Sequence, residues 1–263
     1  MNAPATSSRA PVAHERVLGI DFVNGTAADA AAFATVNGGC VAIPAAPALL
    51  KLKHDEDYRR ALQRCDLVLP DSGLLALVWR LVSGRTLRKI SGIEYLSALL
   101  NERSLRERGK TFCIVGSSDA KAAALKLLLK EGFEVDEEDF FVAPHEIATT
   151  GDHALLLAIE ERRPTHIIIA LRSGVQETLG IYLRDFLMYR PAIHCVGAAL
   201  GFRSGYESQI PEVLERRHLG WLARLHAEPR MILPRLGIAL SVAIMILRSR
   251  SELPPLQTRW SDR

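Results

Sequence analysis

Short apolar runs alternate with longer segments of helical period along most of the chain. Apolar runs without polar alternation are typical of parallel strands that are covered on both faces. Six such runs predict strands, at residues 39–43, 66–69, 111–115, 139–142, 166–171 and 192–196. Three consecutive isoleucines make the fifth run the strongest. We therefore predict a sheet whose strands are mainly parallel.

Helical segments lie between the predicted strands. Amphipathic or alanine-rich stretches predict helices at residues 26–36, 47–64, 73–82, 118–131, 151–163 and 176–189. Thr26 and the pair Ser118-Asp119 are typical N-terminal caps, and Gly132 is a typical stop. Strands that alternate with helices predict an α/β fold with a doubly wound, mainly parallel, Rossmann-like sheet. Ligands in such folds bind beyond the carboxyl ends of the strands.

The two ends of the chain differ from this pattern. Residues 1–16 are rich in Ala, Pro and Ser, lack the apolar segment of a secretory signal, and predict a disordered leader on a cytoplasmic protein. Residues 17–205 are expected to form the α/β core. Residues 206–250 are expected to form a basic and apolar helical appendage, and residues 251–263 a tail.

The predicted appendage contains an apolar segment with basic neighbours. Residues 236–247 carry no charge, Arg248 and Arg250 follow them, and Pro254-Pro255 are expected to end the helix. Twelve residues are too few for a transmembrane helix, which needs about 20. The segment therefore predicts contact with the inner surface of the cell membrane through residues 219–250. A helix packed on the core, or at a homo-oligomer interface, is the alternative.

Composition narrows the function classes. The chain has 33 basic and 30 acidic residues, and a net charge of +3 is too balanced to indicate nucleic-acid binding. The four cysteines form no Cys-x-x-Cys pair and no zinc spacing with histidine, so we expect buried thiols and no metal site. The sequence lacks a G-x-G-x-x-G fingerprint and a Walker lysine, which argues against a reductase and a P-loop enzyme.

Candidate chemistry follows the predicted strands. Asp71 comes directly after the second strand, where it is placed to act as a general base; capping of the next helix is the alternative. Gly116, before two serines at a helix start, is placed to bind phosphate.

Two further loops carry candidate binding residues. Ser173, Gln176 and Glu177 follow the fifth strand and are placed to contact a sugar, base or diphosphate, with helix capping as the alternative. Gly197 opens a glycine-rich segment after the sixth strand, which implies either close approach of a ligand to the backbone or a tight turn.

Several blocks along the chain together resemble a known family. They are, in order, 66–71, Arg88 with Ser91-Gly92, Gln176-Glu177, the glycine-rich block 196–205 with Pro211, and Trp221, Arg224, Glu228-Pro229 and Arg235. In this order and spacing the sequence resembles the WecG/TagA/CpsF glycosyltransferase family, over about residues 17 to 247.

The resemblance implies an inverting sugar transfer that needs no metal or other cofactor. The implied partners are a UDP-sugar donor, a sugar acceptor linked to polyprenyl diphosphate, and a membrane surface. It implies that Asp71 is the base and that Arg88 and Gln176 lie around the donor. Arg224 and Arg235 match arginines that hold the diphosphate, where they would stabilise the departing UDP.

The sequence departs from the family pattern at several positions. Ile43 and Ala45 replace the Thr and Asn of a Thr-Pro-Asn motif, Gly174 replaces a proline, and Gly220 replaces a glutamate. Arg172 replaces a glycine and would supply a compensating cation. Two hypotheses follow: an active glycosyltransferase of polysaccharide assembly, or a weak or inactive homologue that binds a nucleotide sugar or a partner enzyme.

Overall fold

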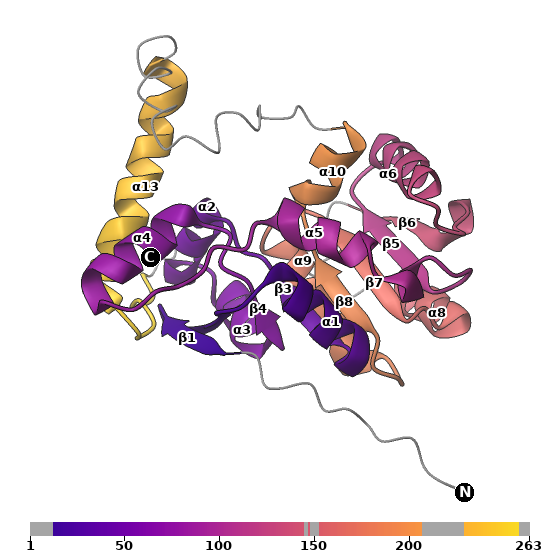
Figure 1. Cartoon of the computed structure of the whole chain (residues 1–263), viewed down its shortest axis with the longest axis horizontal. Coiled ribbons are helices and arrows are strands. Elements are labelled where there is room, and N and C mark those ends of the chain that lie inside the picture. The colour runs from indigo at the N-terminus through magenta and orange to yellow at the C-terminus, as the bar shows by residue number, and fades with distance from the viewer. Residues whose placement is uncertain (1–12, 145–146, 148–152, 207–228, 258–263) are drawn as a thin grey trace, which may run out of the picture.

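The computed structural model describes residues 13–144, 147, 153–206 and 229–257, with residues 229–236 described as backbone only. Within these residues, eight strands form one sheet in the order β1-β2-β4-β3-β8-β7-β5-β6 (Figure 1). Only β1 and β2 pair antiparallel in this sheet. The strands are β1 His14–Val17, β2 Ile20–Val23, β3 Gly39–Ala42, β4 Leu67–Val68, β5 Thr111–Val115, β6 Phe140–Val142, β7 His166–Ala170 and β8 Ala192–Cys195. All six predicted strands are confirmed.

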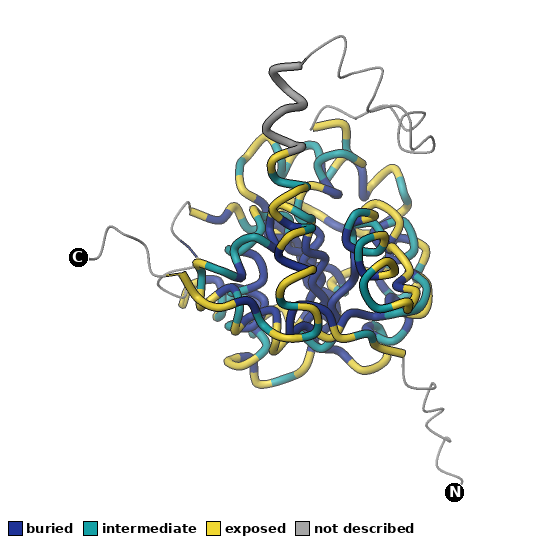
Figure 2. The backbone as a smooth tube through the Cα atoms, turned by 90° about the vertical axis from the view of Figure 1, so that its left-hand side faces the viewer, coloured by how far each residue is buried: buried dark blue, intermediate teal, exposed yellow. Residues whose placement is uncertain are grey.

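Helices cover both faces of the sheet. The described helices are α1 Ala27–Asn37, α2 Ala46–Leu49, α3 Glu56–Arg64, α4 Gly73–Ser83, α5 Gly92–Leu100, α6 Ser118–Lys130, α8 His153–Arg162, α9 Val175–Phe186, α10 Ala198–Ser204 and α13 Pro229–Ser249, with short 3₁₀ helices η1 Leu50–Lys53, η2 Arg103–Leu105 and η3 Glu137–Asp139. On one face α5 packs against α1 and α10, and α10 packs against α6. On the other face α3 packs against α9, and α8 joins the same apolar cluster. Figure 2 shows the backbone between these layers as buried. The predicted α/β fold is confirmed.

Hydroxyl side chains start four of the helices. Thr26, Ser72, Ser91 and Ser117 each accept a hydrogen bond at 3.1 Å from a main-chain N–H in the first turn of α1, α4, α5 and α6. Such a cap stabilises a helix by about 1 kcal/mol. Ser117, rather than the predicted pair Ser118-Asp119, caps α6. The predicted stop is confirmed, because Gly132 follows α6 at a φ of +83°.

The predicted disordered leader, residues 1–16, extends too far into the chain. Residues 14–16, which were expected in the leader, belong to β1, and residues 1–12 lie outside the described part. Glu15 anchors this strand, since its Oε1 accepts hydrogen bonds at 3.2 Å from Trp79 Nε1 and from Arg85 Nη1. The turn into β2 is made by Leu18 and Gly19, both at positive φ.

The predicted helix 47–64 is broken. The segment forms α2, η1 and then α3, because the Asp55 side chain accepts a hydrogen bond from Tyr58 N at 2.9 Å and starts a new helix. Tyr58, in the first turn of the new helix, is fully buried. The predicted helix 176–189 also ends early, at Phe186.

Helix α13 is longer than the predicted apolar segment 236–247. It begins at Pro229 and ends at Ser249, so Pro254-Pro255 do not end it. One face, with Val242, Met245 and Ile246, is buried against α4 and α2. The alternative of a helix packed on the core is therefore correct for this face. No helix in the described part of the chain is long and apolar enough to cross a membrane.

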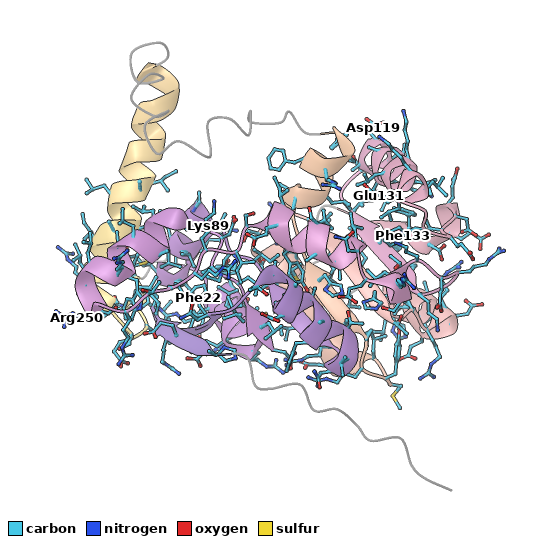
Figure 3. All side chains as sticks on the ribbon, viewed as in Figure 1. Phe22, Lys89, Asp119, Glu131, Phe133 and Arg250 are labelled. Atoms are coloured by element: carbon cyan, nitrogen blue, oxygen red, sulfur yellow. The ribbon has the colours of Figure 1, made fainter. Side chains whose placement is uncertain are left out.

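The chain returns to the core after α13, and Arg250, labelled in Figure 3, is the first residue beyond the end of that helix. The main-chain oxygens of Arg250 and Ser251 accept hydrogen bonds from Leu18 N at 2.7 Å and Gly19 N at 2.9 Å. Gln257 N donates to the Lys53 oxygen at 2.7 Å. The predicted tail is therefore attached to the first hairpin and to η1 as far as residue 257.

Candidate active site

The loops after β3 and β8 leave the sheet toward opposite faces. After β3 the chain runs through α2 to α3, which packs against α9; after β8 it enters α10, which packs against α5 and α6. Because β3 and β8 are neighbours in the sheet, a crevice opens between these loops at a topological switch point. Two adjoining cavities lie at this carboxyl edge.

The first cavity, which we call the Asp71 cavity, has a volume of about 310 Å³. Loops after β3, β4, β7 and β8 and the start of α5 contribute its wall. Its polar lining residues are Asp71, Ser91, Arg172, Ser173 and Gln176, and its larger apolar ones include Ile43, Ile93 and Phe202. Residues predicted from three separate loops are thus brought together: Asp71 after β4, Ser173 and Gln176 after β7, and Gly197 after β8.

Asp71 is oriented by the start of α5. Its Oδ1 accepts a hydrogen bond at 3.2 Å from the N–H of Gly92, the first residue of that helix. Ser72 and not Asp71 caps α4, so the alternative of capping that helix is wrong. A helix N-terminus stabilises negative charge nearby, and a carboxylate that lines a cavity is placed to accept a proton from a ligand.

A buried carboxylate holds the loop between β7 and α9. Glu177 accepts hydrogen bonds from Gly174 N at 2.5 Å, Ser173 Oγ at 3.1 Å and Gln176 Nε2 at 3.2 Å. Burial raises the pKa of Glu177, and these hydrogen bonds oppose that shift. Its side chain is fully buried and lines neither cavity, so the geometry supports the capping role rather than ligand contact.

Gln176 presents an unsatisfied polar atom at the Asp71 cavity. Its side chain is 3% exposed, and Oε1 has no hydrogen-bond partner among the described residues. Gly197, at a φ of +53°, lies so close that a Cβ there would be 3.3 Å from the Gln176 amide. A buried acceptor without a partner destabilises the folded protein by about 1–3 kcal/mol. A ligand that donates a hydrogen bond to Gln176 Oε1 would remove this cost.

Lys51 fixes the same loop from the other side. Its Nζ donates a hydrogen bond to the Ser173 main-chain oxygen at 2.5 Å and lies above the Tyr58 ring. Gly174 has a φ of +95°, and a Cβ there would be 2.7 Å from Lys51 Nζ. No sequence signal identifies Lys51, because it lies 122 residues from its partner.

Replacing Lys51 by alanine is expected to loosen this loop. A hydrogen bond from a charged donor contributes about 1.5–3 kcal/mol, so amide hydrogen exchange over residues 172–177 should accelerate about tenfold or more. Exchange followed by mass spectrometry measures this. Lys53→Ala is the matched control, since its side chain makes no hydrogen bond in the described part. Equal exchange rates over residues 172–177 in the two variants would contradict the role of Lys51 in holding this loop.

The second cavity, which we call the Gly116 cavity, has a volume of about 500 Å³. Gly116, Ser117, Gly197 and Tyr206 are among its lining residues, and Ser117 Oγ lies 3.3 Å from the Tyr206 hydroxyl. Arg172 lines both cavities. Its side chain forms no ion pair with any acidic residue of the described part, so its charge is available to an anion that spans the two cavities.

Of the three predicted arginines, only the side chain of Arg88 is described, and it lies away from the cavities. Arg88 is exposed on the loop between α4 and α5, where its main-chain N–H donates to Asn24 Oδ1 at 3.1 Å, and it lines neither cavity. Arg224 lies outside the described residues, and Arg235 lies in the part of α13 that is described as backbone only. Their roles stay predictions.

A buried polar chain lies apart from the cavities and was not predicted. His166 Nδ1 and His194 Nε2 are 3.2 Å apart, and the Tyr95 hydroxyl lies 2.8 Å from His194 Nδ1. Burial lowers the pKa of both histidines, that of His166 to about 4. Both histidines stand inside apolar strands, where the sequence pattern does not distinguish them from core residues.

Comparison with known proteins adds one finding. A family model described as the glycosyl transferase WecG/TagA/CpsF family matches residues 15–254 of the chain. A search of curated proteins gave no match. Among the described residues, no group of three or more His, Cys, Asp or Glu side chains is arranged to hold a metal ion.

Proposed function

Because the chain belongs to the glycosyl transferase WecG/TagA/CpsF family, we propose that it transfers a sugar from a UDP-sugar to a sugar acceptor linked to polyprenyl diphosphate. Family membership makes the chain a glycosyltransferase. Its assignment as a hexosyl- or N-acetylhexosaminyltransferase of cell-surface or exopolysaccharide synthesis is our proposal. The proposed reaction is inverting and needs no metal.

In the proposed step, Asp71 accepts the proton of an acceptor hydroxyl. The hydroxyl oxygen forms a bond to the anomeric carbon of the donor sugar from the face opposite to UDP. The bond between that carbon and the UDP oxygen breaks, and UDP leaves with the electron pair. Arg172 stabilises the growing negative charge on the diphosphate in place of a metal ion.

One observation carries this proposal: Asp71, Arg172 and Gln176 line the same cavity at the switch point. A base, a cation and an unsatisfied hydrogen-bond acceptor are the groups that an acceptor hydroxyl, a diphosphate and a sugar would contact. The Gly116 cavity next to it offers space for the rest of the nucleotide, at the N-terminus of α6.

The test is transfer by the full-length protein with a panel of UDP-sugars and polyprenyl-diphosphate-linked mono- and disaccharides. Release of UDP that requires both a donor and a lipid-linked acceptor supports the proposal and names the donor. Release of UDP without any acceptor would indicate hydrolysis instead. If no combination of donor and acceptor gives turnover, and calorimetry detects no UDP binding, the proposed substrate class is wrong.

A second candidate function is supported by the apolar part of the same cavity. Ile43 and Ala45 line it where the family pattern has two polar residues. Each missing hydrogen bond to a substrate would cost about 1–3 kcal/mol, so the chain would bind a nucleotide sugar with weak or no transfer. UDP binding without turnover on any acceptor would favour this candidate, and robust transfer would exclude it.

We also propose that the cytoplasmic face of the cell membrane contacts α13. Leu240, Ile244 and Leu247 repeat at helical spacing on the face of α13 opposite its buried residues, and all three are exposed. Leu77 and Leu81 are exposed on α4, against which α13 packs. Basic Arg248 and Arg250 at the end of α13 suit anionic lipids.

Replacing both Leu240 and Leu247 by glutamate is expected to lower binding to anionic vesicles at least about tenfold, because each buried leucine contributes about 1.5–3 kcal/mol. Flotation with vesicles that contain phosphatidylglycerol measures this, and neutral vesicles serve as the lipid control. Leu157→Glu is the matched protein control, since Leu157 is similarly exposed on α8. If the unaltered protein does not float, the membrane proposal fails.

A further inference from the structure

Three of the four cysteines form one cluster in the core. The Cys40 sulfur lies 3.7 Å from that of Cys65 and 4.0 Å from that of Cys195. Cys40 is on β3, Cys195 is on the neighbouring β8, and Cys65 follows the last residue of α3. Cys113 lies in a different apolar cluster, so it serves as a control for the three clustered thiols. All four are free thiols; the predicted burial is confirmed for Cys40, Cys113 and Cys195, whereas Cys65 is half-buried.

The cluster differs from ordinary buried thiols in its electrostatics and access. S–H groups of Cys195 and Cys65 beside Cys40 lower the pKa of its thiol to about 5, against the effect of burial. The pKa values of Cys65 and Cys195 are raised instead. Cys65 is half-buried and lines a cavity of about 450 Å³ at the opposite edge of the sheet from the candidate active site. A small oxidant can therefore reach Cys65 while Cys40 stays covered.

Helix α9 rests directly on this cluster. Gly180 faces the sulfurs so closely that a Cβ there would lie 2.9 Å from Cys40 Sγ and 3.1 Å from Cys195 Sγ. The Cys195 sulfur also lies 3.3 Å from the main-chain oxygen of Gln176, in the first turn of α9. The same helix thus carries Gln176 at one end and touches the thiols at its centre.

We propose that Cys65 and Cys40 are a redox-active pair that a peroxide converts into a disulfide. The Cys65 sulfur attacks a peroxide oxygen as its proton leaves; the O–O bond breaks, and the departing hydroxide takes up that proton as the first water. Cys40 sulfur then attacks the Cys65 sulfenic acid, the S–O bond breaks, and the leaving hydroxide takes the remaining thiol proton as water. Two thiols are oxidised and one hydrogen peroxide is reduced to two waters.

The geometry suits this bond and couples it to α9. The two sulfurs must approach from 3.7 Å to about 2.04 Å, which side-chain rotation provides when the backbones are adjacent. They are adjacent here, because Asp66 N donates to the Cys40 oxygen at 2.9 Å. Formation of the bond draws the Cys40 sulfur away from Cys195 and Gly180. Helix α9 then loses packing beneath its centre, close to the loop that carries Gln176.

The first test is covalent and does not depend on any assay of transfer. The full-length protein is treated with hydrogen peroxide, and free thiols, intact mass and the linked peptides are measured. We expect two thiols to remain, the loss of two hydrogens, a Cys40–Cys65 linked peptide, and full reversal by dithiothreitol. Cys113→Ala should keep the bond and Cys65→Ser should abolish it. A Cys40–Cys195 bond, or four thiols that stay free, would overturn the proposal.

The second test addresses α9. Amide hydrogen exchange over residues 175–186 should accelerate in the oxidised protein, and return to its starting rate on reduction. Unchanged exchange in a protein that carries the disulfide would overturn the coupling to α9. Any effect on UDP affinity rests on the proposed function, so a bond that forms in a protein without UDP binding would remove that function and leave the redox pair intact.

Discussion

Replacing Asp71 by asparagine is expected to lower the rate of sugar transfer about 10²–10⁴-fold, because asparagine cannot take the proton of the acceptor hydroxyl. Asparagine has a similar shape, and its side-chain oxygen can still accept the hydrogen bond from Gly92 N that Asp71 accepts. The start of α5 should therefore keep its place. The measurement is the initial rate of UDP release at saturating donor and acceptor, together with UDP affinity by calorimetry, which should stay unchanged.

The matched control is Asp119→Asn, the same chemical change at an exposed position on α6 (Figure 3). Asp119 also follows a strand and starts a helix, but it lines neither cavity. This variant should keep the full rate. An Asp71→Asn protein that transfers as fast as the unaltered one would exclude Asp71 as the base, whereas loss of UDP affinity would assign it to donor binding.

The folded protein is expected to lose stability as the pH falls from about 6.5 to 4, because of the buried histidine pair. Burial lowers the pKa of His166 from 6.5 to about 4 and lowers that of His194 as well. Below pH 6.5 the unfolded chain takes up protons that the folded chain does not, so unfolding becomes more favourable. For His166 alone this amounts to about 3 kcal/mol by pH 4.

Urea unfolding midpoints, recorded from pH 7.5 down to pH 4, measure this effect. Carboxylates also lower stability in acid, so the comparison of variants isolates the histidines. His166→Asn should be less stable at pH 7.5 and should lose less stability on acidification. His54→Gln, at an exposed position, should follow the unaltered protein. If His166→Asn showed the same pH dependence as the unaltered protein, the pair would not be its source.

Much of the fold follows from the apolar runs. β5 and β7 are long and uniformly apolar, and both lie where they were predicted. The hairpin of β1 and β2 was not predicted, because its strands have four residues each and include charged ones such as Glu15, Arg16 and Asp21. These strands are held by contacts with distant residues, and no local pattern reports such contacts. Tertiary contacts decide strand formation here.

The candidate site was predicted in part, for a related reason. Asp71 and Gln176 were identified because the residues after parallel strands share one edge of the sheet. Which side chain of a loop faces the cavity depends on capping geometry, and the sequence does not distinguish Glu177, turned into the core, from Gln176 beside it. Lys51 and the cysteine cluster depend on packing between segments far apart in the chain.

The edge of the sheet formed by β1 and β2 cannot be completed in the order in which the chain is synthesised. β1 and β2 are synthesised before α13, but Phe22 belongs to the same apolar cluster as Val242, Met245 and Ile246 of α13, and the Leu18–Gly19 turn is hydrogen-bonded to residues 250–251. A segment that is synthesised much later therefore completes the surroundings of β1 and β2. The strands from β3 to β8 can pair before α13 is made, whereas the edge of β1 and β2 stays incomplete until α13 has been synthesised.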